Sequence, residues 1–426
     1  MKSNIYLYML ASEWTYRLCS VTVYTIILAY LFVRLVGFES GSGIWVLFLV
    51  LCELLRLAMR LREGPLELAM GTSFVLLFAF TAPGIYLLQG TDVTLYVALM
   101  ILFKDALQFV GRSSYIPSRM AWSNFSVSSA SSVIAIFLFL GIALGSNVIL
   151  SGVLAKIGFI APYAIALIYY ECYLRDSNTK RYQSIFVFVL FLVVIAIYVY
   201  VFWSGFGRIE IGSFLLIPML ILNFYRDMGI RTMHAILVGP ALIFLAQLSR
   251  YGSVDSGERL VFGSVGAHIT YTDELWGGNT YIQNGGLVAW LDQWVLLFFN
   301  WVPRDFWPSK PIGLGYSAVD EWIGRDGFSE GYSISVGFIG EQYYLLGSGF
   351  WLGLVVVFIT LVSLRIVVQR YCCGYIAPLV MYDVNLMSYF WGGGAAFGSR
   401  MFFFIVPAIL FLMFVDRFMI RSFKIH

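Results

Sequence analysis

A series of long apolar stretches, separated by short polar gaps, constrains this chain more than any other feature. A membrane-spanning helix needs about 20 mainly apolar residues, and twelve stretches meet or approach that length. They lie near residues 20–37, 43–58, 69–88, 93–110, 130–145, 149–172, 184–203, 211–225, 233–249, 334–364, 372–392 and 401–416. Charged residues make up only 12% of the chain, about half the share of a typical soluble domain. The sequence therefore predicts an all-α, polytopic integral membrane protein.

Basic residues occur in every second gap between these stretches. The positive-inside rule assigns such gaps to the cytoplasm, which predicts that both termini are cytoplasmic. The basic residues are Arg56, Arg60, Arg62, Arg112, Arg119, Arg175, Lys180, Arg181, Arg226, Arg231, Arg370, Arg417, Arg421 and Lys424. Nine predicted spans then occupy residues 1–249, a large external loop occupies 250–333, and three spans occupy 334–426.

Two details of this plan are specific enough to check. The stretch 334–364 is too long for one straight span, and Gly347–Gly349 is expected to break or bend it. In the external loop, residues 286–301 have an amphipathic pattern with Trp at the rim, which predicts a helix lying on the membrane surface.

Several classes of chemistry have no sequence support. A net charge of +3 gives no reason to expect a nucleic-acid partner. The sequence contains no Asp-x-Asp motif, P-loop, Rossmann glycine pattern or His/Cys cluster with metal-ligand spacing. We therefore expect no metal and no cofactor. The five cysteines lie in or beside apolar runs and are interpreted as free thiols.

Two arginines lie on the predicted external side, where the charge rule does not expect cations. Arg208 ends the turn Gly205–Arg208 between two spans, and Arg400 ends a Gly-rich turn that starts at Gly392. A guanidinium is planar and donates in a fork that matches phosphate oxygens, so the two turns predict a diphosphate clamp. Alternatively, Arg208 snorkels to the interface and pairs with Glu210 or a lipid phosphate.

The external loop adds further cations, including Arg250, and an unusual run over residues 300–311. Three prolines restrict that run's backbone, and aromatic residues such as Trp307 alternate with Arg304 and Lys310. Aromatic faces stack on sugar rings and cations hold phosphate, so the run is a candidate glycan or diphosphate contact. The alternative is an interfacial anchor in which Arg304 pairs with the neighbouring Asp305.

Two residues are candidates for a general base. His268 is the external histidine and lies near acidic residues, and a histidine titrates near working pH. Glu341 lies about two turns into the span that begins near residue 334. Other intramembrane charges have structural interpretations: Lys104 and Asp105 as a pair, and Asp383 as a helix-packing residue with Asn385.

The second half of the chain resembles the bacterial oligosaccharide repeat-unit polymerases, the O-antigen or Wzy-type family. The order of five motifs carries the resemblance over about 200–420, and the first half matches only in hydropathy. The motifs are Gly205–Arg208, Leu248–Gly252, Val302–Pro311, Ser335–Gly349 and Ser399–Phe404.

The resemblance implies a GT-C-like, metal-independent glycosyltransferase in the bacterial inner membrane. Its donor and acceptor would be undecaprenyl-diphosphate-linked oligosaccharides, and its other partners membrane lipids and a chain-length regulator protein. Arg208 and Arg400 would act on the diphosphate, with His268 or Glu341 as base, and the remaining binding residues would be Arg250, Arg304, Lys310 and Trp307.

Three other functions stay open at this point. An O-antigen ligase would share the loop and arginines but pass the glycan to lipid A core. A flippase for lipid-linked sugars would need charges along a path through the membrane, and these are few. A non-catalytic scaffold would not need arginines in external turns.

Overall fold

The computed structural model describes a chain of helices. The residues described are 2–35, 44–60, 63–79, 82–83, 87, 93–111, 127–146, 152–176, 180–202, 208–239, 286–323, 326, 329, 337–372 and 374–423. These residues form helices and turns and contain no strand. Six of their helices are long and apolar enough to cross a membrane. The protein is therefore an all-α membrane protein, while the predicted total of twelve spans stays a prediction.

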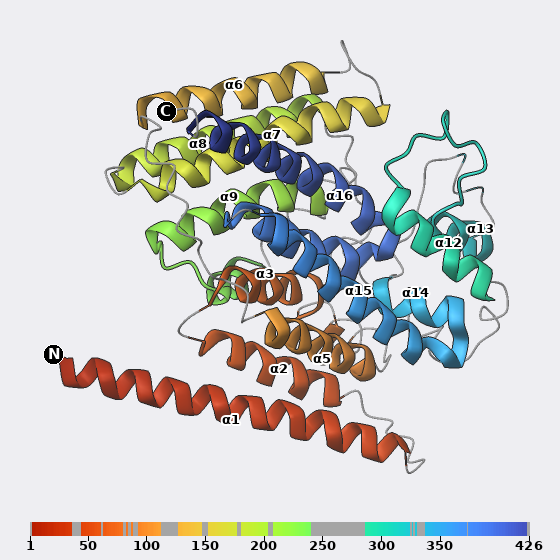
Figure 1. Ribbon diagram of the computed structural model, residues 1–426. Coiled ribbons are helices and arrows are strands. Elements are labelled where there is room, and N and C mark those ends of the chain that lie inside the picture. Colours follow the sequence, from red (N-terminus) through yellow and green to blue (C-terminus); the bar gives the residue numbers. More distant parts are fainter. Residues whose placement is uncertain are drawn as a thin grey trace. The chain divides into compact units, whose positions relative to one another are not determined.

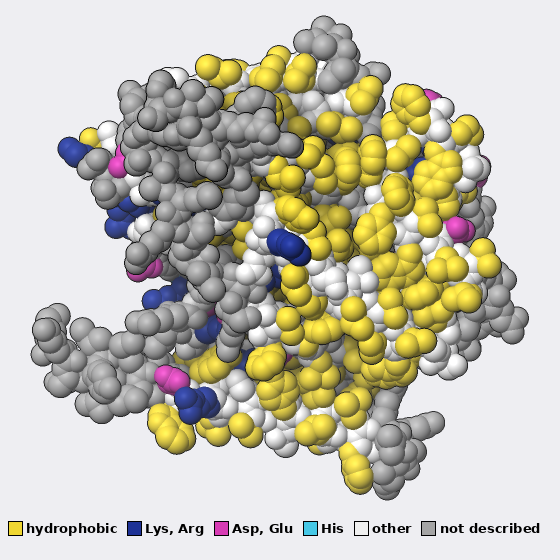
Figure 2. All heavy atoms as spheres, in the orientation of Figure 1, with side chains coloured by type: hydrophobic (Ala, Val, Ile, Leu, Met, Phe, Trp, Pro, Cys, Tyr) yellow, Lys and Arg dark blue, Asp and Glu magenta, His cyan; other side chains and the backbone are white. Residues whose placement is uncertain are grey.

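Large apolar side chains lie on the outer faces of these helices. Figure 2 shows hydrophobic side chains over much of one face, with few charged groups among them. Leu18, Phe48, Phe139, Phe186 and Phe414 are each more than half exposed. Such a surface is suited to lipid, because in water it would be a large aggregation-prone patch.

The chain folds into two compact units, each made of segments from different parts of the sequence. The first unit contains residues 1–109, 230–286 and 334–354. Its helices are α1 (Lys2–Leu35), α2 (Ile44–Ala58), α3 (Pro65–Phe74), the π-helical turn η1 (Val75–Ala79), α5 (Thr94–Gly111), α14 (Gly337–Leu346) and the 3-10 turn η4 (Gly347–Gly349). Helices α1 and α2 run side by side, as Figure 1 shows.

The second unit contains residues 110–229, 287–333 and 355–426. Its helices are α6 (Val127–Gly145), α7 (Gly152–Arg175), α8 (Arg181–Phe202), α9 (Arg208–Arg226), α12 (Gly286–Phe299), α13 (Leu314–Ile323), most of α15 (Phe350–Tyr371) and α16 (Ala377–Phe423). Its core is an aromatic cluster in which Phe214 of α9 contacts Phe159, Tyr163 and Tyr198, with ring centroids 5.0–5.3 Å apart.

The predicted interruption near residue 347 is confirmed. Helix α14 ends at Leu346, and Gly347 has a φ of 55°, in the left-handed region that favours glycine. After the turn, a Cβ placed on Gly353 would lie 2.5 Å from Gln342 Oε1. An unbroken helix would separate these positions by about 16 Å, so the chain bends sharply at Gly347–Gly349.

Helix α16 is a hairpin of two helical arms that meet at Gly393. The φ and ψ of Gly393 are 74° and −168°, a region that is essentially restricted to glycine. The rings of Tyr382 and Phe397 lie 5.8 Å apart, whereas fifteen residues of continuous helix would span about 22 Å. The second arm therefore folds back along the first.

The predicted external turn from Gly392 to Arg400 needs correction. The chain does reverse there, but one residue, Gly393, makes the reversal, and 394–400 are helical. Ala395, Ala396 and Arg400 are good helix formers and continue the helix once Gly393 has turned the chain. Arg400 consequently lies two turns inside the second arm.

The remaining predicted spans correspond to described helices to different extents. Helices α2, α5, α6, α7, α8 and α9 match their predicted stretches within a few residues. Within the stretch 69–88, residues 69–79, 82–83 and 87 are helical, and the others lie outside the described residues. Within 233–249, residues 233–239 are helical, and the rest lie outside the described residues. The helix predicted over 286–301 is confirmed as α12, which ends at Phe299, and its position on the membrane surface stays a prediction.

Candidate functional site

Arg400 lies at the centre of a polar cluster in the second unit. Its Nη1 donates to Ser388 Oγ at 2.5 Å, a bond that joins the two arms of the α16 hairpin. The side chain is only partly exposed, and it interacts electrostatically with Glu210 and Tyr198. Among the described residues, Ser388 is its one hydrogen-bond partner. Within the described part of the chain, the guanidinium is thus held by a neutral group, and its other N–H groups have no described acceptor.

Glu210 and Tyr198 bring the start of α9 and the end of α8 to this cluster. The Tyr198 hydroxyl donates to Glu210 Oε1 at 2.9 Å, and Glu210 is buried. Glu210 lies in the first turn of α9, where the helix dipole stabilises a carboxylate. Arg208 is the first residue of the same helix, and its side chain lies outside the described atoms.

The segment from α12 to residue 314 docks on the second arm of α16 beside Arg400. Asn300 Nδ2 donates to Ala395 O at 2.9 Å, and Trp301 stacks on Phe402 with ring centroids 4.1 Å apart. Gly398 lies so close to α12 that a Cβ there would overlap Leu297 O. The aromatic run predicted to contact substrate therefore belongs to the same part of the molecule as Arg400.

Arg304 and Lys310 hold this run in shape. Arg304 donates to the carbonyls of Lys310 and Pro311 at 2.6 and 2.9 Å. Lys310 Nζ donates to Asn300 O and Val302 O at 2.7 and 3.0 Å. Burial, and then the nearby Arg304 charge, lower the pKa of Lys310. These contacts are structural, and a phosphate contact from Arg304, Lys310 or the partly exposed Trp307 stays a prediction.

Three further predicted site residues lie outside the described part of the second unit. Arg250 and His268 lie outside the described residues. Glu341 is buried in α14 of the first unit. Its role as a base stays a prediction.

Asp383 has a different partner from the predicted one. Its carboxylate accepts from Arg365 Nε at 2.9 Å, and both residues are buried. Asn385 instead donates to Met381 O within its own helix. The prediction failed because Arg365, directly after the predicted stretch 334–364, was given no role, although a buried arginine requires a counter-charge.

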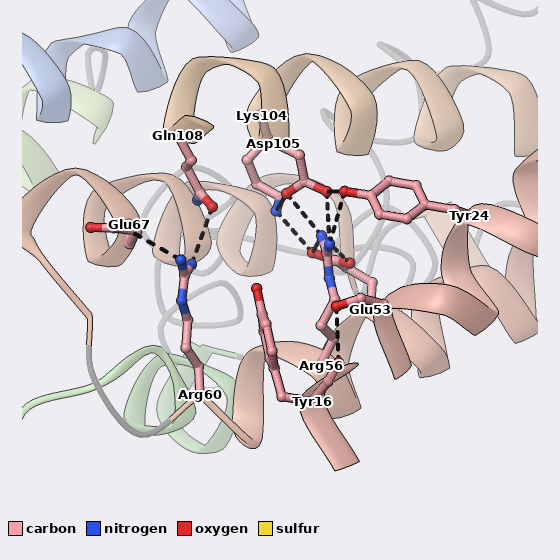
Figure 3. A network of polar contacts seen from close by, with 10 residues as sticks. Tyr16, Tyr24, Glu53, Arg56, Arg60, Glu67, Lys104, Asp105 and Gln108 are labelled. Atoms are coloured by element: carbon pink, nitrogen blue, oxygen red, sulfur yellow. Dashed lines mark hydrogen bonds and ion pairs between the residues drawn. The ribbon is translucent and has the colours of Figure 1, made fainter. Parts of the chain in front are cut away.

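The first unit contains a separate polar network that sequence reasoning recognised only in part. Figure 3 shows Glu53 and Arg56 of α2 facing Lys104 and Asp105 of α5. Lys104 Nζ lies 3.0 Å from Glu53 and 2.7 Å from Asp105. Arg56 lies 2.7 Å from each of the same two carboxylates. The predicted Lys104–Asp105 pair is confirmed, within a larger arrangement of two cations and two anions.

Further contacts extend this network toward α1 and α3. The Tyr24 hydroxyl donates to Asp105 Oδ2 at 2.8 Å. Arg60 donates to Gln108 Oε1 at 3.1 Å and lies 3.5 Å from Glu67 (Figure 3). Arg56 and Arg60 are both buried. They therefore act as internal counter-charges. As buried residues they give weaker support to a cytoplasmic assignment of this gap than exposed loop cations would.

Comparisons with protein-family models, with curated proteins and with solved structures found no match to this chain. The described residues also contain no group of three or more His, Cys, Asp or Glu side chains that could hold a metal ion. The two polar clusters are therefore the features of the described structure that bear on function.

Proposed function

We propose that this protein is a membrane glycosyltransferase that polymerises undecaprenyl-diphosphate-linked oligosaccharide repeat units into a surface polysaccharide of the O-antigen type. The observation that carries the proposal is the Arg400 cluster. A partly exposed guanidinium is held by a serine beside a buried carboxylate, under a segment rich in aromatic residues. Ionisable groups inside membrane proteins are costly, and their retention commonly marks a functional site.

The proposed reaction is displacement at an anomeric carbon. The acceptor sugar's hydroxyl oxygen attacks that carbon, and its bond to the diphosphate oxygen breaks. Negative charge then develops on the leaving diphosphate, where preorganised donors give the largest stabilisation. Arg400 and Arg208 would supply these donors, with Arg250, Arg304 and Lys310 assisting. No metal or cofactor is part of the proposal.

The proposed location is the external face of the bacterial inner membrane, with both termini cytoplasmic. The alternation of basic gaps supports it. Cysteines introduced at Ser256 and Asn178 would test it in cells with a permeable outer membrane. Labelling of position 178 rather than 256 by an impermeant reagent would reverse the orientation and exclude the proposed site.

The function itself is tested by deleting the gene and separating surface polysaccharide on a gel. A polymerase deletion leaves single repeat units attached to the surface acceptor, such as lipid A core. A ligase deletion removes attached glycan altogether, and a flippase deletion stops export. Complementation with the unchanged gene should restore long chains, whereas Arg400→Ala should leave single repeats at equal protein abundance. Either of the other two gel patterns would replace the proposal with the corresponding function.

A further inference from the structure

We propose that Glu210 is the general base of the transfer reaction, an assignment that rests on the proposed function. Sequence reasoning considered Glu210 only as a counter-charge for Arg208, and it weighed His268 and Glu341 as bases. In the described part of the second unit, the charge of Glu210 acts on Arg400, and the helix of Glu210 packs against the helix of Arg400.

The first argument is the position of the carboxylate. Glu210 belongs to the first turn of α9, and α9 packs against both α8 and α16. Its charge interacts with Arg400, yet no ion pair or hydrogen bond joins them among the described contacts. A carboxylate bound directly to the arginine would neutralise the group needed for the diphosphate. Here both charges stay available to a substrate.

The second argument is the hydrogen bonding of the two carboxylate oxygens. Oε1 accepts from Tyr198 at 2.9 Å, which fixes the orientation of the group. Among the described contacts, Oε2 accepts no hydrogen bond. A base needs this combination of one oriented oxygen and one oxygen within reach of a proton.

The groups facing Glu210 come from the three helices packed against α9. Tyr198 comes from α8, and Arg400 and Ser388 come from α16. From α7, Tyr163 donates to Phe214 O, one turn further along α9. None of these described neighbours is a second carboxylate, so Glu210 is the member of this set to which we assign the role of base.

The proposed step transfers one proton and exchanges one bond at the anomeric carbon. The O–H bond of the attacking sugar hydroxyl breaks, and its proton passes to Glu210 Oε2. The hydroxyl's electron pair forms the new bond to the anomeric carbon. The bond from that carbon to the diphosphate oxygen breaks, and its electron pair leaves with the diphosphate beside Arg400. Glu210 then releases the proton to water.

The test uses purified full-length protein in proteoliposomes with a lipid-linked repeat unit. In Glu210→Gln, the amide oxygen still accepts from Tyr198, so the fold should persist, as checked by thermal unfolding. We expect kcat to fall about 10²–10⁴-fold, with little change in donor KM and loss of the acid limb of the pH–rate profile. In Glu210→Asp, the carboxylate is one methylene further away, so kcat should fall less and the acid limb should remain.

Two results would overturn the assignment. A wild-type kcat in Glu210→Gln would exclude a base at this position. A rise in the donor KM with an unchanged kcat would make Glu210 a positioning residue. Glu13→Gln removes an exposed carboxylate on α1 and serves as the control, and it should retain the rate. The proposed function fails separately, if the unchanged protein elongates no lipid-linked repeat unit.

Discussion

The two polar clusters of this protein differ in how their charges are satisfied. In the first unit, two cations and two carboxylates lie 2.7–3.0 Å from one another. In the second unit, Arg400 is held by the neutral Ser388, and its nearest described carboxylate is not in contact. Full pairing leaves little capacity for a ligand, whereas partial pairing retains it. We infer from this difference that the first cluster holds helices together, whereas the second is suited to bind a ligand.

The largest expected effect is on stability, from Lys104→Met in the first unit. Lys104 is only 1% exposed, and its removal leaves Glu53 and Asp105 to share one cation, Arg56. Breaking a buried pair in this way typically costs about 3–5 kcal/mol, which thermal unfolding of the purified protein would measure.

The matched control is Arg17→Met on α1. Arg17 pairs with Glu13 at 2.9 Å, but their side chains are 70% and 61% exposed. Such a pair contributes only about 0.3–0.5 kcal/mol. The double variant Lys104→Met/Glu53→Gln restores neutrality and should regain part of the lost stability. An unfolding temperature for Lys104→Met equal to that of the control would show that the network is not structural.

Arg400 should show the opposite behaviour. Arg400→Ala is expected to fold normally but to lose about 2.7–4 kcal/mol of transition-state stabilisation, as when one oxyanion donor is removed. Arg400→Lys should restore little, because a point charge cannot donate in a fork to two phosphate oxygens. Elongation kinetics in proteoliposomes measure both variants. Full activity of the lysine variant would rule out the bidentate role.

A smaller effect is expected where α12 docks beside Arg400. In Gly398→Ala, the new methyl would overlap Leu297 O, and overpacking of this kind costs about 1–3 kcal/mol. The control is Gly313→Ala in the same docked segment, where the nearest atom to a Cβ lies at an ordinary 3.8 Å. Unfolding temperatures would compare the two, and equal values would contradict the close helix contact.

The smallest effect concerns the stacking of Trp301 on Phe402. Trp301→Leu keeps an apolar side chain but loses the stacked pair, which is worth about 0.5–1.5 kcal/mol. Phe306 is 80% exposed, so Phe306→Leu should leave the unfolding temperature unchanged. A larger loss from Phe306→Leu than from Trp301→Leu would assign the docking to a different part of the segment.

Hydropathy predicted helices α2 and α5 to α9 within a few residues, and glycine chemistry located the breaks. A break at Gly347–Gly349 was predicted because glycines occur there inside one long apolar stretch. The reversal at Gly393 was predicted as a longer turn, since sequence does not reveal which of three consecutive glycines adopts the left-handed conformation. Such a choice depends on the packing of the two arms.

Side-chain pairing was the part that sequence could not supply. Glu53 and Lys104 belong to different helices, and the contact between them depends on how those helices pack. The same holds for Arg365 with Asp383. Helical periodicity indicates which residues share a face, but not which carboxylate on another helix will meet a given cation. The Arg400 neighbourhood therefore required the structure, although Arg400 itself was predicted from its unusual position.

The central claim is that Arg400 is the cation available to a diphosphate, and lipid binding tests it most directly. The affinity of the purified full-length protein for undecaprenyl diphosphate would be measured in vesicles of fixed composition, for the unchanged protein and for Arg400→Ala. The account predicts at least a tenfold weaker affinity for the variant, equivalent to about 1.4 kcal/mol, at an unchanged unfolding temperature. Equal affinities of the two proteins would contradict it.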